Sequence, residues 1–304
     1  MNSKIDLHMH CNASDGSDTV PELLEKIKTM NITTFALTDH DTMKGALEME
    51  KLVPPGIRFI RGIELSCVSK VAKCHILGYA YDPGNTELQM LVKELHEIRK
   101  NKTHNRFRFL TDEFGFEFTE EERRKIETKE SPGKPDFKEL IEKKLREANP
   151  GGKAVNIYET YFKHLPDGRI DAIHAIKAVK AAGGVAVWAH PLGGTGEKRL
   201  TESQFRAQLD LLCSVGLDGL ECHYSEYTKK EVATLCHAAN EKGLRISCGS
   251  DYHGTKKPHL HLGMLNKEDA IIREEQLTVL DAFCGTQRIM LHFRADALRS
   301  KRTP

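Results

Sequence analysis

Two histidines near the N-terminus, His8 and His10, stand one residue apart directly after the β-rich run Lys4–Leu7. Side chains alternate between the two faces of a strand, so both imidazoles would lie on one side and could bind the same metal ion. Asp15 follows in a segment of turn-forming residues that can bring its carboxylate back toward the pair. A single His-x-His pair is a weak signal of a metal site. The interpretation as a metal site gains support because similar side chains recur at other predicted strands along the chain.

Metal-competent side chains lie in or directly after most of the other predicted strands as well. They are His40, Glu64, His75, His190, Asp251 and His253, which with His8, His10 and Asp15 make nine candidate ligands, and Asp39 stands beside His40. In a parallel α/β barrel the carboxyl ends of the strands share one face, where residues distant in sequence meet. Burying so many ionisable groups together is costly unless cations compensate. The pattern therefore predicts a metal centre with more than one ion.

The predicted ligands are imidazole nitrogens and carboxylate oxygens, with no requirement for a thiolate. Such a set suits Zn, Mn or Fe and does not distinguish among them. Nine ligands exceed the four of one tetrahedral zinc ion, so two or three divalent ions are expected. Clustered divalent ions favour hydrolysis of anionic substrates, and phosphate esters gain most because negative charge surrounds their reacting centre.

Eight other histidines do not lie at a predicted strand in this way, and we expect them to be surface residues or to make local hydrogen bonds. They are His96, His104, His164, His174, His237, His259, His261 and His292.

The elements that must position these residues alternate between strands and helices. The predicted strands are Lys4–Leu7, Thr34–Thr38, Arg58–Leu65, Cys74–Tyr81, Gly184–Ala189, Leu217–Cys222 and Leu244–Cys248, and the predicted helices include Val20–Met30, Ala172–Ala182, Thr201–Ser214 and Thr228–Lys242. This alternation, with continuous apolar strands, is typical of a parallel sheet covered by helices. Too little chain separates the third and fourth strands for a helix, so they are expected to form a hairpin.

The segment from Gln89 to Leu165 is rich in Lys, Glu and Arg, is helical by propensity and contains no matching strand. We interpret it as a mostly helical insertion, which divides the chain into a first barrel part (1–88), the insertion (89–165) and a second barrel part (166–304). Its charges are typical of a solvated face, although an insertion at the end of a strand can also form an active-site lid.

The composition excludes several classes of protein. The 304 residues include 45 basic and 44 acidic side chains, so a net charge of +1 gives no general attraction to nucleic acid or to an anionic membrane, although a local basic groove stays possible. No apolar run approaches the roughly 20 residues that span a bilayer, and there is no signal-peptide pattern. The eight scattered cysteines favour a reduced, cytoplasmic protein.

The order of these motifs resembles the PHP (polymerase and histidinol phosphatase) superfamily of metal-dependent phosphoesterases. The matching residues are His8-x-His10, Ser14-Asp15-Gly16, Thr38-Asp39-His40, Gly62-Ile-Glu64, His75 with Leu77-Gly78, Ala189-His190-Pro191 and Gly249-Ser-Asp251-x-His253. They extend over almost the whole chain. The resemblance is greatest to the stand-alone branch with a helical insertion, which includes nucleoside 3′,5′-bisphosphate phosphatases and 5′-3′ exoribonucleases that act on short RNA.

The resemblance implies a distorted (β/α)7 barrel with a trinuclear centre and a hydroxide between the ions that attacks phosphorus. By motif, the first ion would be held by His8, His10, Glu64 and Asp251. Glu64 would bridge to a second ion at His75 and His190, and the third would take Asp15, His40 and His253. Asp39 would either support a ligand histidine or act directly in catalysis.

The chain also departs from its relatives where substrate is expected. An Arg-x-His-Phe-like motif near the lid is replaced by Lys134-Pro-Asp136-Phe137, which keeps a positive charge but loses the bidentate fork and adds an acid that would repel phosphate. Cys222-His223-Tyr224-Ser225 replaces a stretch of small residues. We therefore take Lys134, His223 and Ser225 as candidate substrate contacts, and His223 also as a candidate acid for the leaving oxygen.

The expected activity is hydrolysis of phosphate monoesters on a small metabolite or nucleotide, with a nucleoside 3′,5′-bisphosphate as one option. Three alternatives remain: trimming of short RNA ends, amide or lactone hydrolysis on the same metals, and a non-catalytic binding module. The sequence does not indicate the oligomeric state.

Overall fold

The computed structural model describes residues 3–129 and 131–283. They form one eight-stranded sheet whose main path runs β1-β2-β3-β4-β6-β7-β8, with β5 beside β3. The strands are β1 (Ile5–Asp6), β2 (Thr34–Leu37), β3 (Arg58–Val68), β4 (Lys73–Tyr79), β5 (Ile170–Asp171), β6 (Val185–Ala189), β7 (Gly219–Tyr224) and β8 (Arg245–Gly249). A parallel bridge between Met9 and Tyr252 joins the two ends of this path. The sheet is thus a nearly closed barrel, as predicted.

One strand runs against the others. β3 and β4 form the expected antiparallel hairpin, and β4 also pairs antiparallel with β6, while the remaining neighbours are parallel. The sheet is therefore mixed: it is parallel except at β4, whose reversed direction follows from the predicted hairpin. The reversal has a useful consequence, because His75 near the start of β4 pairs with Ser66 and Ala189 near the ends of β3 and β6. It therefore lies at the same end of the barrel as the carboxyl ends of the other strands.

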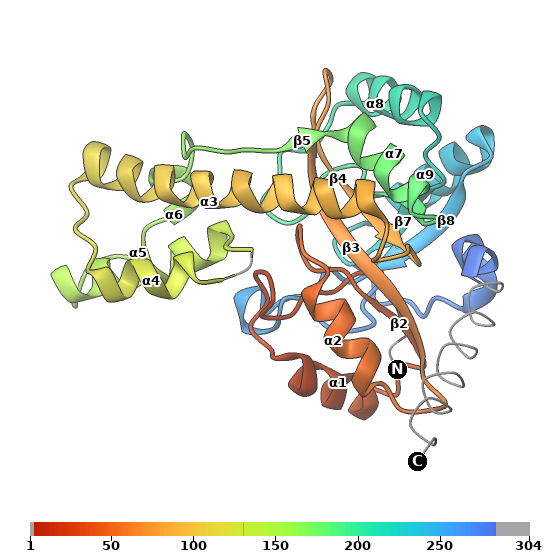
Figure 1. Cartoon of the computed structure of the whole chain (residues 1–304), viewed down its shortest axis with the longest axis horizontal. Helices are drawn as coiled ribbons and strands as arrows, with labels where there is room; N and C mark the ends of the chain where they lie inside the picture. Colours follow the sequence, from red (N-terminus) through yellow and green to blue (C-terminus); the bar gives the residue numbers. More distant parts are fainter. Residues whose placement is uncertain (1–2, 130, 284–304) are drawn as a thin grey trace, which may run out of the picture.

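Helices cover the outside of the barrel (Figure 1). They are α1 (Val20–Thr29), α2 (Lys44–Leu52), α7 (Ala172–Ala181), α8 (Glu202–Ser214) and α9 (Lys229–Lys242), and three short 3₁₀ turns follow at Gly254–Lys256, Glu274–Gln276 and Thr278–Phe283. Capping boxes begin α1, α8 and α9, where a threonine and a Glu or Gln three residues later satisfy free backbone N–H groups. The four predicted helices are confirmed. The short α2 and β5 were not predicted, because each buries only a few small or isolated apolar residues.

The segment predicted as an insertion is helical throughout its regular parts. It contains α3 (Thr86–Phe114), α4 (Glu120–Glu127), α5 (Lys134–Ala148) and α6 (Ile157–Thr160). Figure 1 shows α3 extending from the barrel to a lobe formed with α4, α5 and α6. Near its start Leu88 and Leu95 pack in the core shared with the barrel, whereas Phe107 packs with Phe137 in the core of the lobe. The single helix α3 thus packs against both the barrel and the lobe. The division of the chain into three parts at 88/89 and 165/166 stays a prediction.

None of the helices in residues 3–129 and 131–283 is both long and apolar enough to cross a bilayer. His292 lies outside these residues.

Candidate metal centre

The first group of predicted ligands joins the N-terminal strand to the last one. His8, His10, Glu64 and Asp251 are all buried and offer donor atoms that lie within 4.8 Å of one another. The Oε2 atom of Glu64 lies 3.2 Å from Nε2 of both His8 and His10. Oδ1 of Asp251 lies 3.6 Å from His8 Nε2 and 3.3 Å from His10 Nε2. Two imidazoles and two carboxylates therefore face one point, as the His-x-His spacing predicts.

The second group uses the other oxygen of Glu64. Its Oε1 atom lies 3.2 Å from Nδ1 of His75 and 3.1 Å from Nε2 of His190, and these two nitrogens are 3.3 Å apart. Ligands at about 2.1 Å around a zinc-like ion are separated from one another by roughly 3.0–3.4 Å. The triangle of donor atoms thus has the size of one face of a metal coordination shell.

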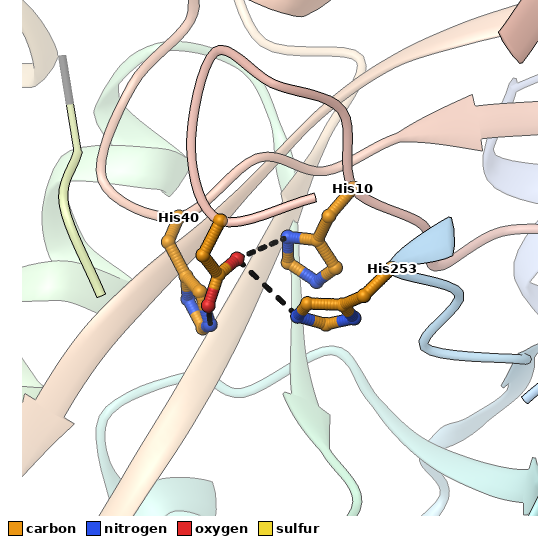
Figure 2. Close-up of side chains that lie close together, drawn as sticks. His10, His40 and His253 are labelled. Carbon is orange, nitrogen blue, oxygen red and sulfur yellow. Dashed lines mark ion pairs between the residues drawn. The ribbon is translucent and has the colours of Figure 1, made fainter. Parts of the chain in front are cut away.

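The third group lies beside the first. Figure 2 shows the imidazoles of His10, His40 and His253 pointing toward one another. Oδ1 of Asp15 lies 3.2 Å from His253 Nε2 and 3.8 Å from His10 Nδ1, and Oδ2 lies 3.9 Å from His40 Nε2. The nine predicted ligands are therefore brought together in connected groups, with His10 and Glu64 shared between neighbours. Donor atoms of His40, Glu64 and His75 also lie within 4.8 Å of one another and join the second group to the third.

Buried atoms of these groups lack hydrogen-bond partners among the described residues. They are His8 Nε2, His10 Nε2, His40 Nδ1, Glu64 Oε2 and His253 Nε2. Buried polar atoms are nearly always satisfied, so a cluster of unsatisfied ones needs an explanation. Imidazole and carboxylate lone pairs that are directed at shared points can be satisfied by bound divalent cations. The donor set therefore fits a metal centre.

Two of these residues have unusual backbone conformations at the ends of their strands. His190 follows β6 with φ 30°, and Asp251 follows β8 with φ 57°, both in the left-handed region. Such conformations cost of order 1–3 kcal/mol and tend to persist at functional sites. Position 249, two residues before Asp251, must be glycine for steric reasons, because a Cβ there would lie 2.0 Å from Cβ of His8. Local backbone strain and close packing thus aim both side chains at the centre.

Further polar side chains hold the ligands in place. Glu221 on β7 accepts hydrogen bonds from His8 Nδ1 at 2.9 Å and from the backbone N–H of His190 at 2.7 Å, so it links the first group to the second. Tyr224 and Lys257 donate to Oδ2 of Asp251 at 3.0 and 2.8 Å. Supporting contacts of this kind fix the orientation of a ligand and commonly control metal affinity. None of these three residues lies in a motif that predicts a role at the centre.

The charges of the centre stabilise one another. Burial alone would raise the pKa of the Glu64 carboxyl, but His40, His8 and His75 outweigh it and hold that pKa well below its usual range. Burial alone would lower the pKa of His10, but Asp251 and Glu64 raise it to about 9. In the same way Glu197 and Glu64 raise the pKa of His190 to about 10. Without metal, both rings are thus protonated at neutral pH.

Metal binding is therefore expected to release protons and to tighten as the pH rises from 7 toward 9. A cation must displace the protons of His10 and His190, and each displaced proton changes the apparent affinity about tenfold per pH unit below its pKa. Calorimetric titration with Mn²⁺ in buffers of different ionisation enthalpy measures both quantities. An affinity that is the same at pH 7 and pH 9 would contradict this electrostatic description.

A pocket opens beside the metal-site residues and is lined by basic side chains. They are Arg99, Lys102, Arg106, Lys134, Arg169 and Lys257. Arg99 is paired with Asp41 and Arg169 with Asp167. In contrast, Lys134 makes no ion pair among the described residues, with Asp167 acting on it only at longer range, and Nη1 of Arg106 is buried without a hydrogen bond. The pocket therefore has positive charge available for an anion next to the candidate metal ions.

Lys134 and Asp136, at the start of α5, have different roles from one another. Lys134 lines the pocket, where burial and the nearby Arg106 lower its pKa. Asp136 accepts a hydrogen bond from the backbone N–H of Gly133 at 2.8 Å and pairs with Lys129, so it caps the start of α5. The expected repulsion between Asp136 and phosphate is therefore not supported, because the carboxylate is already neutralised at the helix terminus.

The structure does not bring the other predicted site residues to the pocket. The side chain of His223 contacts Cys236 on α9, and Ser225 Oγ donates to the carbonyl of Ser250 at 2.9 Å. Asp39 accepts hydrogen bonds from the backbone N–H of Cys11 and from Ser14 Oγ at 2.9 and 2.6 Å. The geometry supports neither a substrate contact for His223 and Ser225 nor direct catalysis by Asp39. Asp39 has a supporting role, but it holds the loop that follows His10 and makes no hydrogen bond to a ligand histidine in the described structure.

Known proteins with similar sequences are phosphoesterases by name. The chain is 28% identical to a 5′-3′ exoribonuclease of Haemophilus influenzae (83% of this chain, 91% of the relative). It is 30% identical to a phosphoribosyl 1,2-cyclic phosphate 1,2-diphosphodiesterase of Eggerthella lenta (84% and 97%) and 26% identical to a 3′,5′-nucleoside bisphosphate phosphatase of Chromobacterium violaceum (83% and 87%).

Solved structures share the fold. A protein of Bifidobacterium adolescentis that is classed as a metal-dependent phosphoesterase superposes with a TM-score of 0.71 at 26% identity, over 92% of this chain and 95% of that one. An amidohydrolase of Chromobacterium violaceum, with bound sulfate, gives a TM-score of 0.72 at 23% identity over 83% and 88% of the two chains, which shows the fold alone. The PHP domain profile matches residues 6–182. Both the sequence and the fold thus confirm the resemblance, and this chain belongs to the PHP domain family.

Proposed function

We propose that this hydrolase, a metal-dependent phosphoesterase, removes phosphate from a small phosphorylated metabolite or nucleotide, and that a nucleoside 3′,5′-bisphosphate is the first substrate to test. The observation that carries the proposal is the basic pocket directly beside three groups of potential metal ligands. A substrate with two phosphates would place one at the metal centre and the other among the basic side chains. The named activities of the relatives, all on phosphate esters, agree with this chemistry.

Two or three divalent ions of Mn, Zn or Fe would be held by the residues of the three groups. His8, His10, Glu64 and Asp251 would hold the first, Glu64, His75 and His190 the second, and Asp15, His40 and His253, with His10 shared, the third. When bound, such ions supply a water of lowered pKa and neutralise the phosphoryl oxygens.

The chain itself would bind and orient the substrate. The guanidinium of Arg106, with one buried N–H group unsatisfied, and the ammonium of Lys134 are available as donors to phosphate oxygens. Arg99 is instead held by Asp41 and Ser66 and would shape the wall of the pocket. Because these side chains come from α3 and α5, the helical segment would contribute substrate contacts and would form one side of the active site.

A substrate panel tests this proposal. Manganese-loaded protein is expected to release inorganic phosphate from a nucleoside 3′,5′-bisphosphate with a higher kcat/KM than from nucleoside monophosphates, because only the bisphosphate also engages the basic pocket. A preference for 5′-phosphorylated oligoribonucleotides would instead support the exoribonuclease alternative. Release of no phosphate from any ester, with hydrolysis of amides or lactones, would contradict the proposal.

Replacing Lys134 by Ala is expected to raise KM about 10- to 100-fold with a smaller effect on kcat, because a charge-assisted contact to phosphate contributes about 1.5–3 kcal/mol. Lys134→Arg should retain most of the affinity. Lys138→Ala is a matched control on the same helix, since the side chain of Lys138 is half-buried and pairs only with Glu142 in the described structure. Steady-state kinetics of the three variants decides the role, and an unchanged KM for Lys134→Ala would exclude a substrate contact.

A further inference from the structure

The second group of potential ligands contains a residue that the motifs of the chain do not include. We propose that Glu197 is an additional metal ligand, carried by the loop after β6, at the position formed by Glu64, His75 and His190. The inference rests on the proposed metal centre and adds a tenth residue to its nine predicted ligands. It also implies that an incoming phosphate has to compete with this carboxylate.

The two oxygens of Glu197 face the two histidines separately. Oε1 lies 3.5 Å from Nδ1 of His75, the nitrogen that also faces Glu64. Oε2 lies 3.2 Å from Nδ1 of His190 and accepts a hydrogen bond from the backbone N–H of Gly194 at 3.0 Å. Oε2 would thus keep a proton on Nδ1 of His190, leaving Nε2 for the ion, while Oε1 is free to act as a ligand.

The three other donors leave room for a fourth. His75 Nδ1, His190 Nε2 and Glu64 Oε1 are 3.1–3.3 Å apart and form one face of a coordination shell. The separation of 3.5 Å between His75 Nδ1 and Glu197 Oε1 is close to the roughly 3.4 Å expected between ligands of a tetrahedral ion. Donor atoms of His75, His190 and Glu197 lie within 4.8 Å of one another. Glu197 is therefore within reach of an ion held by His75 and His190.

The loop that carries Glu197 is built to hold it there. Gly193 and Gly196 have φ 105° and 75°, conformations that favour glycine, and they allow the tight turn before Glu197. Thr195 anchors this turn, because its backbone N–H donates to Tyr224 at 3.1 Å and its Oγ1 donates to Glu226 at 2.9 Å. The position of Glu197 thus depends on contacts with β7 and the residues after it.

Glu197 differs from the other carboxylates of the centre in its access to the pocket. Its side chain is 30% exposed, whereas that of Glu64 is 1% exposed. It also lines the same pocket as Lys134 and Arg106. A phosphate that approaches the ion at His75 and His190 therefore meets the negative charge of Glu197 first. Removing that charge should weaken retention of one ion and, when the ion is supplied in excess, strengthen the binding of phosphate.

The test compares Glu197→Gln with the wild-type chain and with Glu226→Gln. The control keeps an oxygen that can accept the anchoring hydrogen bond from Thr195, and Glu226 contacts none of the metal-site histidines in the described structure. Manganese-loaded proteins are dialysed against increasing concentrations of a chelator, and the metal bound per chain is measured by mass spectrometry. Glu197→Gln is expected to lose one ion at about a tenfold or more lower chelator concentration, and Glu226→Gln to behave like wild type.

The second measurement is calorimetric binding of inorganic phosphate at saturating Mn²⁺. Glu197→Gln is expected to bind phosphate several-fold more tightly than wild type. Wild-type metal retention in Glu197→Gln would overturn the proposal. Weaker metal retention together with weaker phosphate binding would also overturn it, because that result indicates a merely structural role. Neither measurement depends on turnover, so a failure of the proposed phosphatase activity would be seen separately.

Discussion

Asp251→Asn and His8→Ala are each expected to lower phosphate-ester turnover by about 10²- to 10³-fold or more, the size of effect seen when a group that stabilises developing charge is removed. Asparagine keeps the shape of Asp251 and can still accept from Tyr224, but it loses the negative charge that faces His8 and His10 at 3.6 and 3.3 Å. Both variants should also bind fewer ions per chain, since each removes a donor from the first group.

The control for this prediction is His237→Ala. His237 is on α9, its side chain is 73% exposed, and it pairs with Glu241 on the surface. Its replacement should change neither turnover nor metal content. If His237→Ala were as damaging as His8→Ala, or if Asp251→Asn kept its full complement of metal, the assignment of the centre would be wrong.

Glu64→Gln is expected to have the largest effect of any single substitution on metal content. Its two oxygens face different groups, with His8 and His10 on one side and His75 and His190 on the other. Loss of the charge should therefore weaken the binding of two ions at once and abolish turnover.

His75→Ala is the matched comparison for Glu64→Gln, because His75 belongs to groups that do not include His8. It should lose only the ion of the second group. The number of metal ions bound per chain, measured after gel filtration, distinguishes the two variants. Equal metal loss in both, or no loss in Glu64→Gln, would contradict a bridging role for this carboxylate.

Much of the metal centre could be predicted from the sequence because its residues follow short apolar strands. A parallel barrel places such residues at one end whatever their separation along the chain. His75 was predicted correctly as part of the cluster, although it lies near the start of β4 and not at its end. The antiparallel direction of β4 explains this, and that direction was indicated by the short connection from β3.

The cations of the pocket were harder to recognise. Arg99, Lys102 and Arg106 recur on one side of α3 and are buried, with exposures of 4%, 7% and 2%. In the sequence they belong to a long charged segment, and charges in such a segment usually face solvent. Their burial depends on the contacts of α3 with the barrel and the lobe, which local spacing does not reveal. The alternative that the insertion forms a lid is the one that the pocket favours.

The expectation for His223 was not supported because of a local irregularity in β7. Strict alternation would place His223 on the same side as Glu221, which faces the metal centre. The pairing of β7 with β8 shifts register between these two residues, so that Cys222 and His223 both contact Cys236 and Tyr224 reaches Asp251 instead. A bulge of this kind changes the direction of every following side chain and leaves no clear sign in a single sequence.

Phosphate release by metal-free and metal-reloaded protein tests the central claim most directly. The chain is stripped with a chelator until less than about one tenth of an ion remains per chain, and activity and metal content are then followed together as Mn²⁺, Zn²⁺ or Fe²⁺ is returned. We expect no measurable hydrolysis of a phosphate ester by the stripped protein and recovery as two or three ions bind. Undiminished hydrolysis by the stripped protein, or a reloaded protein that holds its ions and releases no phosphate from any ester, would contradict the account.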